Sequence, residues 1–309
     1  MHIGLHDADS EHLKDKTFPN YALMKISAYH KARGDTVSWW NPLESEDFDK
    51  VYSSKIFDFT PENPYLLHSA IKGGTGYNVK SVLPSDIDAM TPDYSIYPAC
   101  DYATGFLTRG CPNSCRWCLV PEKEGGIKPY RNWQELVRLD SNRLVLMDNN
   151  ILACEHGIKQ LESLAGSDYE IDLNQGMDAR LFNEHIADIC ASIKWIRYVR
   201  FSCDTYFQVE YIKNAINLLV ERGIKPYRVH VYLLITENID DAAARVDALR
   251  HYKGIRLYAQ SEINAKNGIM PNEIQRDFAH RYVRTSLYRK ESWSEYRLHR
   301  KLKGLRGGG

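Results

Sequence analysis

Hydrophobic residues follow two alternating patterns along this chain, short apolar runs that are typical of strands and longer stretches with helical spacing. Within the first hundred residues, this alternation predicts four elements: a strand at 2–5, a helix at 20–33, and strands at 36–40 and 50–57. Gly34 lies where the helix has to end, and the glycine-rich stretch 73–76 is typical of a tight loop. We therefore expect a small Rossmann-like α/β domain over residues 1–95.

Strands and helices alternate with little interruption in the next part of the chain. The pattern predicts strands at 105–108, 143–147, 170–174, 198–203, 228–235 and 254–259. It predicts the intervening helices at 133–139, 156–164, 183–192, 208–222 and 240–252. Strands that are separated by helices pair in parallel, so the fold class is α/β, and we expect a partial (β/α)6 barrel over residues 96–265. The remaining segment, 266–309, is helical in composition and ends in three glycines.

The composition is that of an ordinary globular protein, with 43% hydrophobic and 26% charged residues. No stretch approaches the roughly 20 apolar residues that a membrane-spanning helix requires, and the N-terminus is too polar for a secretory signal. We therefore expect a cytoplasmic protein without membrane association. The net charge is zero, but residues 281–309 hold nine Lys and Arg against two Glu. This basic end suits either a phosphate-bearing partner or a solvated helix face.

Seven cysteines in a chain of this kind favour metal binding or catalysis over a disulfide framework. Three of them form the string Cys111-x3-Cys115-x2-Cys118 on a polar loop. Thiolates are the ligands of iron–sulfur clusters, and three rather than four leave one iron open to a small molecule. A structural zinc site is the alternative, with Cys100 or Cys154 as its fourth ligand. Two further alternatives are an electron-transfer cluster, which usually has four cysteines, and three cysteines without a ligand role.

The same string, with Trp117 before its last cysteine and a six-strand β/α run behind it, resembles the motif of the radical S-adenosylmethionine (SAM) superfamily. The resemblance implies a [4Fe–4S] cluster on Cys111, Cys115 and Cys118, with SAM chelating the fourth iron through its amino and carboxylate groups. One electron from a donor such as flavodoxin or ferredoxin then cleaves SAM to methionine and a 5′-deoxyadenosyl radical, which abstracts a hydrogen atom from the substrate. The reaction subclass, the catalytic residues and the substrate stay open.

Polar residues follow the expected strands at their carboxyl ends, where β/α barrels build their sites. The resemblance implies that Trp117 flanks SAM and that Asp148 and Asn149 lie where the family contacts the amino group of SAM. Asp178, Arg180 and Asp204 are candidate contacts of SAM or of the substrate. Arg180 suits the carboxylate of SAM because a guanidinium pairs with it through two parallel hydrogen bonds. An ordinary surface salt bridge is the competing interpretation of each charged residue. Glu122 and Glu124, just after the cysteines, either reach the substrate or belong to a solvated loop, and the solvated loop is the favoured interpretation.

The N-terminal domain resembles the cobalamin-binding-like domain of one radical SAM subgroup. Cobalamin domains of one common type carry Asp-x-His-x-x-Gly, whereas His30 here has Ala28 in place of the aspartate and Arg33 in place of the glycine. We therefore do not expect cobalamin. No cysteine precedes Cys100 or follows Cys203. Neither the second cluster of tRNA methylthiotransferases nor a C-terminal auxiliary cluster is therefore expected.

Cations and aromatic residues interleave in the C-terminal segment. They are Arg281, Tyr282, Arg284, Tyr288, Arg289, Lys290, Trp293, Tyr296, Arg297, Arg300, Lys301, Lys303 and Arg306. Proteins that bind nucleic acids combine cations for phosphates with rings on which bases stack, so this tail indicates a nucleic acid or nucleotide substrate. The competing interpretation is a helix whose rings pack on the barrel while its cations face water. The rival function is a non-catalytic, zinc-stabilised protein that binds nucleic acid.

Overall fold

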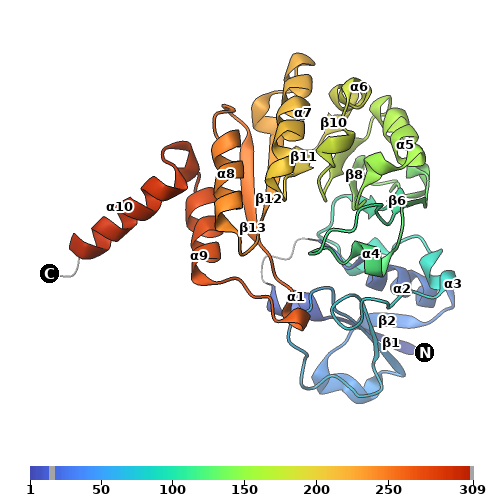
Figure 1. Cartoon of the computed structure of the whole chain (residues 1–309). Coiled ribbons are helices and arrows are strands. Elements are labelled where there is room, and N and C mark those ends of the chain that lie inside the picture. The colour runs from blue at the N-terminus through green and yellow to red at the C-terminus, as the bar shows by residue number, and fades with distance from the viewer. Residues whose placement is uncertain (14–17, 307–309) are drawn as a thin grey trace.

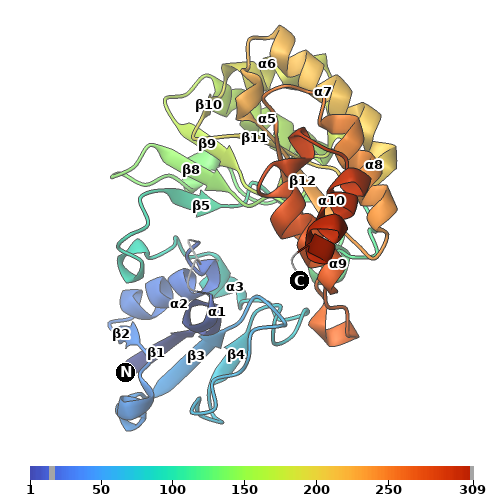
Figure 2. The same ribbon diagram turned by 90° about the vertical axis from the view of Figure 1, so that its left-hand side faces the viewer.

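The computed structural model describes residues 1–13 and 18–306, and its N-terminal part is built on a four-stranded parallel sheet. The sheet has the order β2-β1-β3-β4, with β1 at His2–Asp7, β2 at Thr36–Trp39, β3 at Lys50–Ser54 and β4 at Ile71–Gly73. Helix α2 (Tyr21–Ala32) packs on the sheet through Leu23 and Ile26, which meet Ile3 and Leu5 in a small core of their own. Two short helices, α1 (Ala8–His12) and α3 (Ser85–Asp88), complete this N-terminal unit, which Figure 2 shows beneath the other strands.

The second part of the chain contains two further parallel sheets. The first has the order β10-β9-β8-β5, with β5 at Ala103–Gly105, β8 at Arg143–Leu146, β9 at Glu170–Leu173 and β10 at Lys194–Trp195. The second has the order β11-β12-β13, with β11 at Val199–Ser202, β12 at Val229–Ile235 and β13 at Arg256–Ser261. An isolated parallel bridge between Met177 and Phe201 lies between the two sheets. The α/β class with parallel sheets is therefore confirmed, whereas the curling of these strands into a partial (β/α)6 barrel stays a prediction.

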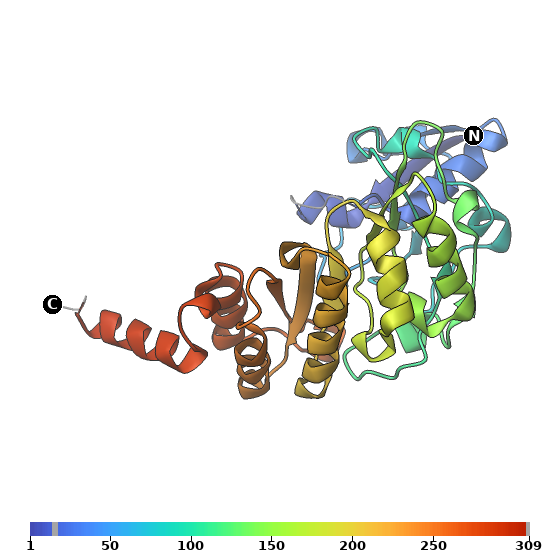
Figure 3. The ribbon, with the colours of Figure 1, turned by 90° about the horizontal axis from the view of Figure 1, so that it is seen from above.

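The predicted helices between these strands are confirmed except for the first. They are α5 (Glu155–Ala165), α6 (Glu184–Ser192), α7 (Val209–Glu221) and α8 (Ile239–Leu249). Figures 1 and 3 show them side by side along one face of the two sheets. Their buried residues pack with alternate residues of the strands in the main core, among them Leu144, Phe201 and Val231. This core fixes the strands whose carboxyl ends carry the predicted site.

The helix predicted at 133–139 is wrong, because this segment forms only a 3-10 turn over Trp133–Glu135. Leu136 is buried, but Leu139 is fully exposed, so the segment lacks the apolar face that would hold a longer helix against the core. Arg138 donates instead to main-chain carbonyls just before β5. Nearby, the short strands β6 (Thr108–Arg109) and β7 (Lys128–Pro129) form an antiparallel pair, and α4 (Val120–Lys123) lies between them in the sequence.

The C-terminal segment consists of α9 (Glu273–Arg276), a π-helical stretch at Asp277–Val283 and α10 (Trp293–Arg306), which projects from the body (Figures 1 and 3). Its rings are buried in the main core: Tyr282, Tyr288, Trp293 and Tyr296. The interpretation that the rings of this segment pack inward is therefore confirmed for these four. The three terminal glycines, 307–309, lie outside the described residues. No helix in the described part of the chain is long and apolar enough to cross a membrane.

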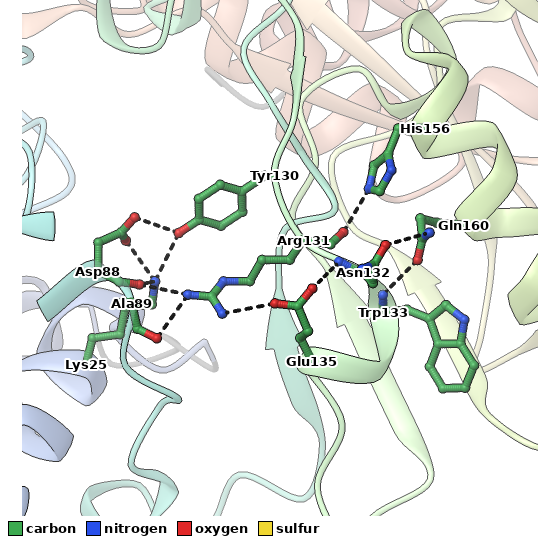
Figure 4. Close-up of polar contacts among 10 residues, drawn as sticks. All are labelled: Lys25, Asp88, Ala89, Tyr130, Arg131, Asn132, Trp133, Glu135, His156 and Gln160. Atoms are coloured by element: carbon green, nitrogen blue, oxygen red, sulfur yellow. Dashed lines mark hydrogen bonds and ion pairs between the residues drawn. The ribbon is translucent and has the colours of Figure 1, made fainter. Parts of the chain in front are cut away.

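A buried lysine joins the N-terminal unit to the segment that follows β7. Lys25, on α2, is fully buried, and its Nζ donates to Asp88 Oδ1 at 2.8 Å and to the Tyr130 hydroxyl at 3.1 Å (Figure 4). Tyr130 donates to Asp88 Oδ2 at 2.7 Å, and Arg131 donates to the carbonyl oxygens of Asp88 and Ala89. Burial lowers the pKa of Lys25, while its hydrogen bond to Asp88 opposes this shift. The network therefore holds the two parts of the chain together through a buried cation and its acceptors.

A second and more exposed contact joins the N-terminal unit to the segment after β13. The main-chain nitrogen of Lys266 donates to Asp58 Oδ2 at 3.1 Å, and its Nζ donates to the carbonyl oxygen of Thr75 at 3.0 Å. Lys123, at the end of α4, also donates to the carbonyl oxygen of Ser81. The N-terminal unit therefore contacts the chain near both the first and the last strand of the β/α run.

Replacing Lys25 by Met removes the buried donor, and we expect the free energy of unfolding to fall by about 2 kcal/mol because Asp88 and Tyr130 lose their partner. Lys31→Met is the matched control, since Lys31 lies on the same helix and pairs with Asp93 at 2.7 Å while 40% exposed. Its loss should cost less than about 1 kcal/mol. Urea unfolding of both variants measures the difference, and equal losses would contradict a stabilising role for the buried network.

Candidate functional site

The three clustered cysteines lie on a loop that the antiparallel pair of β6 with β7 closes at its base. The main-chain nitrogen of Cys111 donates to the carbonyl oxygen of Gly125 at 3.1 Å, which brings the start and the end of this cysteine loop together. Gly110 has a left-handed backbone with φ of 84°, and a Cβ at this position would overlap the carbonyl oxygen of Gly126. The loop therefore requires glycine immediately before its first cysteine.

The three thiols lie close enough to influence one another. Cys111 and Cys115 are partly exposed, and Cys118 is exposed. Burial raises the pKa of Cys115, and negative charge on Cys118, Asp204 and Cys111 raises it further. Burial also raises the pKa of Cys118, with contributions from Cys111 and Asp204. The three predicted ligands therefore share one electrostatic environment, and Asp204 belongs to it.

The chemistry of the donor set fits a three-cysteine cluster, although the thiols are not arranged around a metal position. Across the described residues, no three His, Cys, Asp or Glu side chains are placed to hold a metal ion. The fit depends instead on three thiols that belong to one short closed loop and that solvent reaches. The assignment of Cys111, Cys115 and Cys118 as ligands therefore stays a prediction.

Two predicted SAM-binding residues, Asp178 and Arg180, form an ion pair beside the cysteine loop. Arg180 Nε and Nη2 donate to the Asp178 carboxylate at 2.8 and 2.6 Å, and Asn113 Nδ2, from within the cysteine motif, donates to it at 3.2 Å. Burial raises the pKa of Asp178, but its hydrogen bonds with Arg180 outweigh this effect and hold the pKa below its usual value. Asn150 Nδ2 lies 3.4 Å from Asp178 Oδ2 and 3.6 Å from Cys111 Sγ, so it links the ion pair to the thiols.

Asn150 is a site residue that the sequence analysis missed. Its side chain is almost fully buried, and its Oδ1 has no hydrogen-bond partner among the described residues. A buried acceptor without a donor costs free energy, so this oxygen is an unsatisfied group at the site. The tandem Asn149–Asn150 at the end of an apolar run is the sequence signal that could have indicated this position.

Asp148 fixes the entry to the cysteine loop. Its buried carboxylate accepts hydrogen bonds from the Leu107 nitrogen at 3.1 Å, the Thr108 nitrogen at 2.5 Å and Thr108 Oγ1 at 2.7 Å. Burial raises the pKa of Asp148 to about 6, while the hydrogen bonds from Thr108 and Leu107 oppose this shift. Because these groups engage both oxygens, the geometry gives Asp148 a role in positioning the loop. Its predicted contact with SAM stays a prediction.

Glu124 holds the other side of the same loop. Its Oε1 accepts a hydrogen bond from Arg109 Nη2 at 2.6 Å, and its Oε2 accepts from the Gly110 nitrogen at 2.8 Å and from Asn149 Nδ2 at 3.0 Å. The interpretation of Glu124 as part of a solvated loop is therefore wrong, because the loop folds back and buries most of this side chain. Asn149 is brought to the site through this contact, and its predicted contact with SAM stays untested.

The remaining predicted residues, Asp204 and Trp117, lie at the margins of this network. Burial raises the pKa of Asp204, and the nearby guanidinium of Arg245 opposes this shift. Trp117 is partly buried, with the Arg116 guanidinium 5.8 Å from the centre of its ring. Arg116 also lies 3.8 Å from the buried Glu262, just beyond β13, so the cysteine loop extends from the first strand of the run to the last.

Comparisons of this sequence with protein-family models and with curated proteins find no match. The chemistry assigned to the site therefore depends on the contacts of its own residues.

Gly110→Ala should disrupt the cysteine loop, because the new Cβ overlaps a main-chain oxygen. Gly125→Ala is the matched control, since Gly125 has a similar left-handed backbone (φ of 73°) but open space around its Cβ position. We expect the free energy of unfolding to fall by about 1 kcal/mol in the control and by about 3 kcal/mol or more in Gly110→Ala. Chemical unfolding of both proteins measures this, and equal effects would show that backbone strain alone explains the glycine.

Proposed function

We propose that this protein is a radical SAM enzyme, in which Cys111, Cys115 and Cys118 hold a [4Fe–4S] cluster and SAM chelates the remaining iron. The observation that carries the proposal is the gathering of three thiols on one closed loop, beside the Asp178–Arg180 ion pair. Three thiolates leave one corner of a cluster open, and the neighbouring polar groups suit the amino and carboxylate groups of an amino acid. The substrate and the subclass of reaction are left open.

A [4Fe–4S] cluster held by Cys111, Cys115 and Cys118 would supply reductive cleavage of SAM to methionine and a 5′-deoxyadenosyl radical, with one electron from a donor such as flavodoxin or ferredoxin. The residues of the chain position the reactants. Asp148 and Glu124 hold the main chain on both sides of the loop, which keeps the thiols in place. Arg180 presents a planar set of donors to the SAM carboxylate, which has to share that guanidinium with Asp178. The unpartnered Oδ1 of Asn150 offers an acceptor for the amino group.

The rival function, a zinc-stabilised protein without catalytic activity, needs a fourth ligand. Cys100 precedes the amino end of β5, whereas the cysteine loop follows the carboxyl end of the same strand. Cys154 is buried immediately before α5. The position of Cys100 therefore favours the three-cysteine cluster over a zinc site that includes this residue.

Protein purified without oxygen should contain about four iron and four sulfide ions per chain, and with SAM and a reductant it should release 5′-deoxyadenosine. Cys115→Ala should lose both properties because it removes a cluster ligand. Cys100→Ala, which removes a partly exposed cysteine at the other end of β5, should keep both. Stoichiometric zinc in place of iron, or equal turnover by Cys115→Ala and the parent protein, would overturn the proposal.

We also propose that the C-terminal segment contacts the phosphates of a nucleic acid substrate. Because Tyr282, Tyr288, Trp293 and Tyr296 are buried, bases cannot stack on their rings, and the proposal is limited to electrostatic attraction between the cations and the phosphates. The cations whose side chains the structure describes remain exposed, among them Arg297, Arg300 and Lys301 on the projecting helix α10. Deleting residues beyond 280 would remove part of the main core, so charge substitutions are the sharper test.

The double variant Arg297→Gln/Lys301→Gln should weaken binding of single-stranded RNA in gel-shift titrations and reduce its dependence on salt, since two phosphate contacts are lost. We expect a loss of about tenfold at low salt. Lys159→Gln/Lys194→Gln removes the same charge from exposed positions elsewhere and should bind like the parent protein. Equal binding by all three proteins, or no binding by any, would contradict a role for this helix.

A further inference from the structure

The sheet β11-β12-β13 has one apolar face and one polar face. In β12, Val229, Val231, Leu233 and Ile235 belong to the main core, so the alternate residues His230 and Tyr232 point to the opposite side. The strand register places Arg200 of β11 and Arg256 of β13 on either side of His230. It also places Tyr258 of β13 next to Tyr232. We refer to the side made by Arg200, His230, Tyr232, Arg256 and Tyr258 as the polar face. Strands of parallel sheets are usually apolar on both faces, so this composition points to a function.

Several polar atoms on the polar face are buried and unpartnered. Arg200 is 7% exposed, and Asp172 on β9 pairs with its Nη1. Its Nε, however, has no hydrogen-bond partner within the described residues, and the same holds for both ring nitrogens of His230. Each buried polar group without a partner costs about 1–3 kcal/mol. A ligand that satisfies these donors and acceptors recovers that free energy on binding.

Aromatic rings surround His230. The ring centroids of Tyr232, Tyr198 and Tyr258 lie 4.9, 5.1 and 5.8 Å from that of His230, and all three tyrosines are partly exposed. Burial and the neighbouring Arg200 and Arg256 lower the pKa of His230 to about 4, so its ring is neutral at pH 7. A neutral imidazole offers one donor and one acceptor, which matches the edge of a nucleic acid base.

The residue types on the polar face change from the amino ends to the carboxyl ends of the strands. At the amino ends of the strands, Arg197 and Arg256 are exposed, with guanidinium groups 5.0 and 5.3 Å from the centre of the Tyr198 ring. Tyr232 and Tyr258 lie farther along β12 and β13. The carboxyl ends of the strands lead to Asp204 and Glu262, which contact or influence the cysteine loop. Exposed cations, rings and thiols therefore follow one another along the strands.

We propose that the polar face binds a nucleotide, with its phosphate on Arg197 and Arg256 and its base among the rings near His230 and Arg200. The base then lies on the side of the phosphate that faces the cysteine loop, at which the 5′-deoxyadenosyl radical would take a hydrogen atom from the substrate, giving 5′-deoxyadenosine and a substrate radical. Only this last step rests on the proposed radical SAM function, because nucleotide binding itself requires neither cluster nor SAM. A single nucleotide and one residue of a nucleic acid present the same chemistry to this surface.

The test is equilibrium dialysis of the full chain, prepared without cluster or SAM, against AMP, GMP, CMP and UMP, with the matching nucleosides and inorganic phosphate as comparisons. At least one nucleotide should bind saturably and about tenfold more tightly than its nucleoside or phosphate. Arg256→Gln changes an exposed residue and should weaken the nucleotide about tenfold while leaving the nucleoside unchanged. His230→Phe keeps a ring without nitrogens and should weaken both, whereas Arg33→Gln, which changes an exposed arginine beside a tyrosine ring on α2, is the matched control.

Failure of all four nucleotides to bind below about 1 mM, or parent-like binding by Arg256→Gln and His230→Phe, would overturn the nucleotide proposal. That result leaves iron content and 5′-deoxyadenosine release unaffected, so it is distinct from failure of the radical SAM function. Conversely, nucleotide binding by a protein that contains no iron when purified without oxygen would support the polar face and refute the cluster. A single strand that Arg297→Gln/Lys301→Gln still binds and Arg256→Gln does not, while free nucleotides fail to bind, would assign the polar face to nucleic acid and overturn binding of the free nucleotide.

Discussion

Two carboxylates, on the buried Asp148 and the largely buried Glu124, fix the main chain on which the candidate site depends. Asp148 binds the amides just before the cysteine loop, and Glu124 binds the amide of Gly110 from the far side of the same loop. A carboxylate that leaves water loses a large hydration free energy, and amide donors offset that loss most directly. The loop entry and the carboxylates therefore stabilise one another, and the thiols can face a shared ligand only while this arrangement holds.

The two faces of the β11-β12-β13 sheet differ in composition. Helices α7 and α8 pack on one face, and the apolar residues there account for the stability of this region. The polar residues of the opposite face do not belong to the main core, and they include cations, a neutral histidine and tyrosines. A sheet that is stabilised by packing on one face can tolerate unpartnered polar atoms on its other face. Side chains that bind a ligand can therefore be placed on that other face.

Much of the fold could be predicted from the sequence, because periods of two and 3.6 residues mark strands and amphipathic helices directly. The cysteine spacing identified the loop, and the polar residues after the strands included the Asp178–Arg180 pair that lies beside it. The positioning roles of Asp148 and Glu124 could not be predicted, since they depend on which distant amides approach each carboxylate. The helix expected at 133–139 failed for a related reason, because a single buried leucine does not make an apolar face.

The two contacts of the N-terminal unit differ greatly in strength, and this difference sets how the molecule can deform. Near the first strand, a buried cation with several acceptors resists separation, whereas near the last strand the attachment through Lys266 consists of exposed hydrogen bonds that water replaces at little cost. We therefore expect the two parts of the chain to separate more readily at the Lys266 edge than at the Lys25 edge.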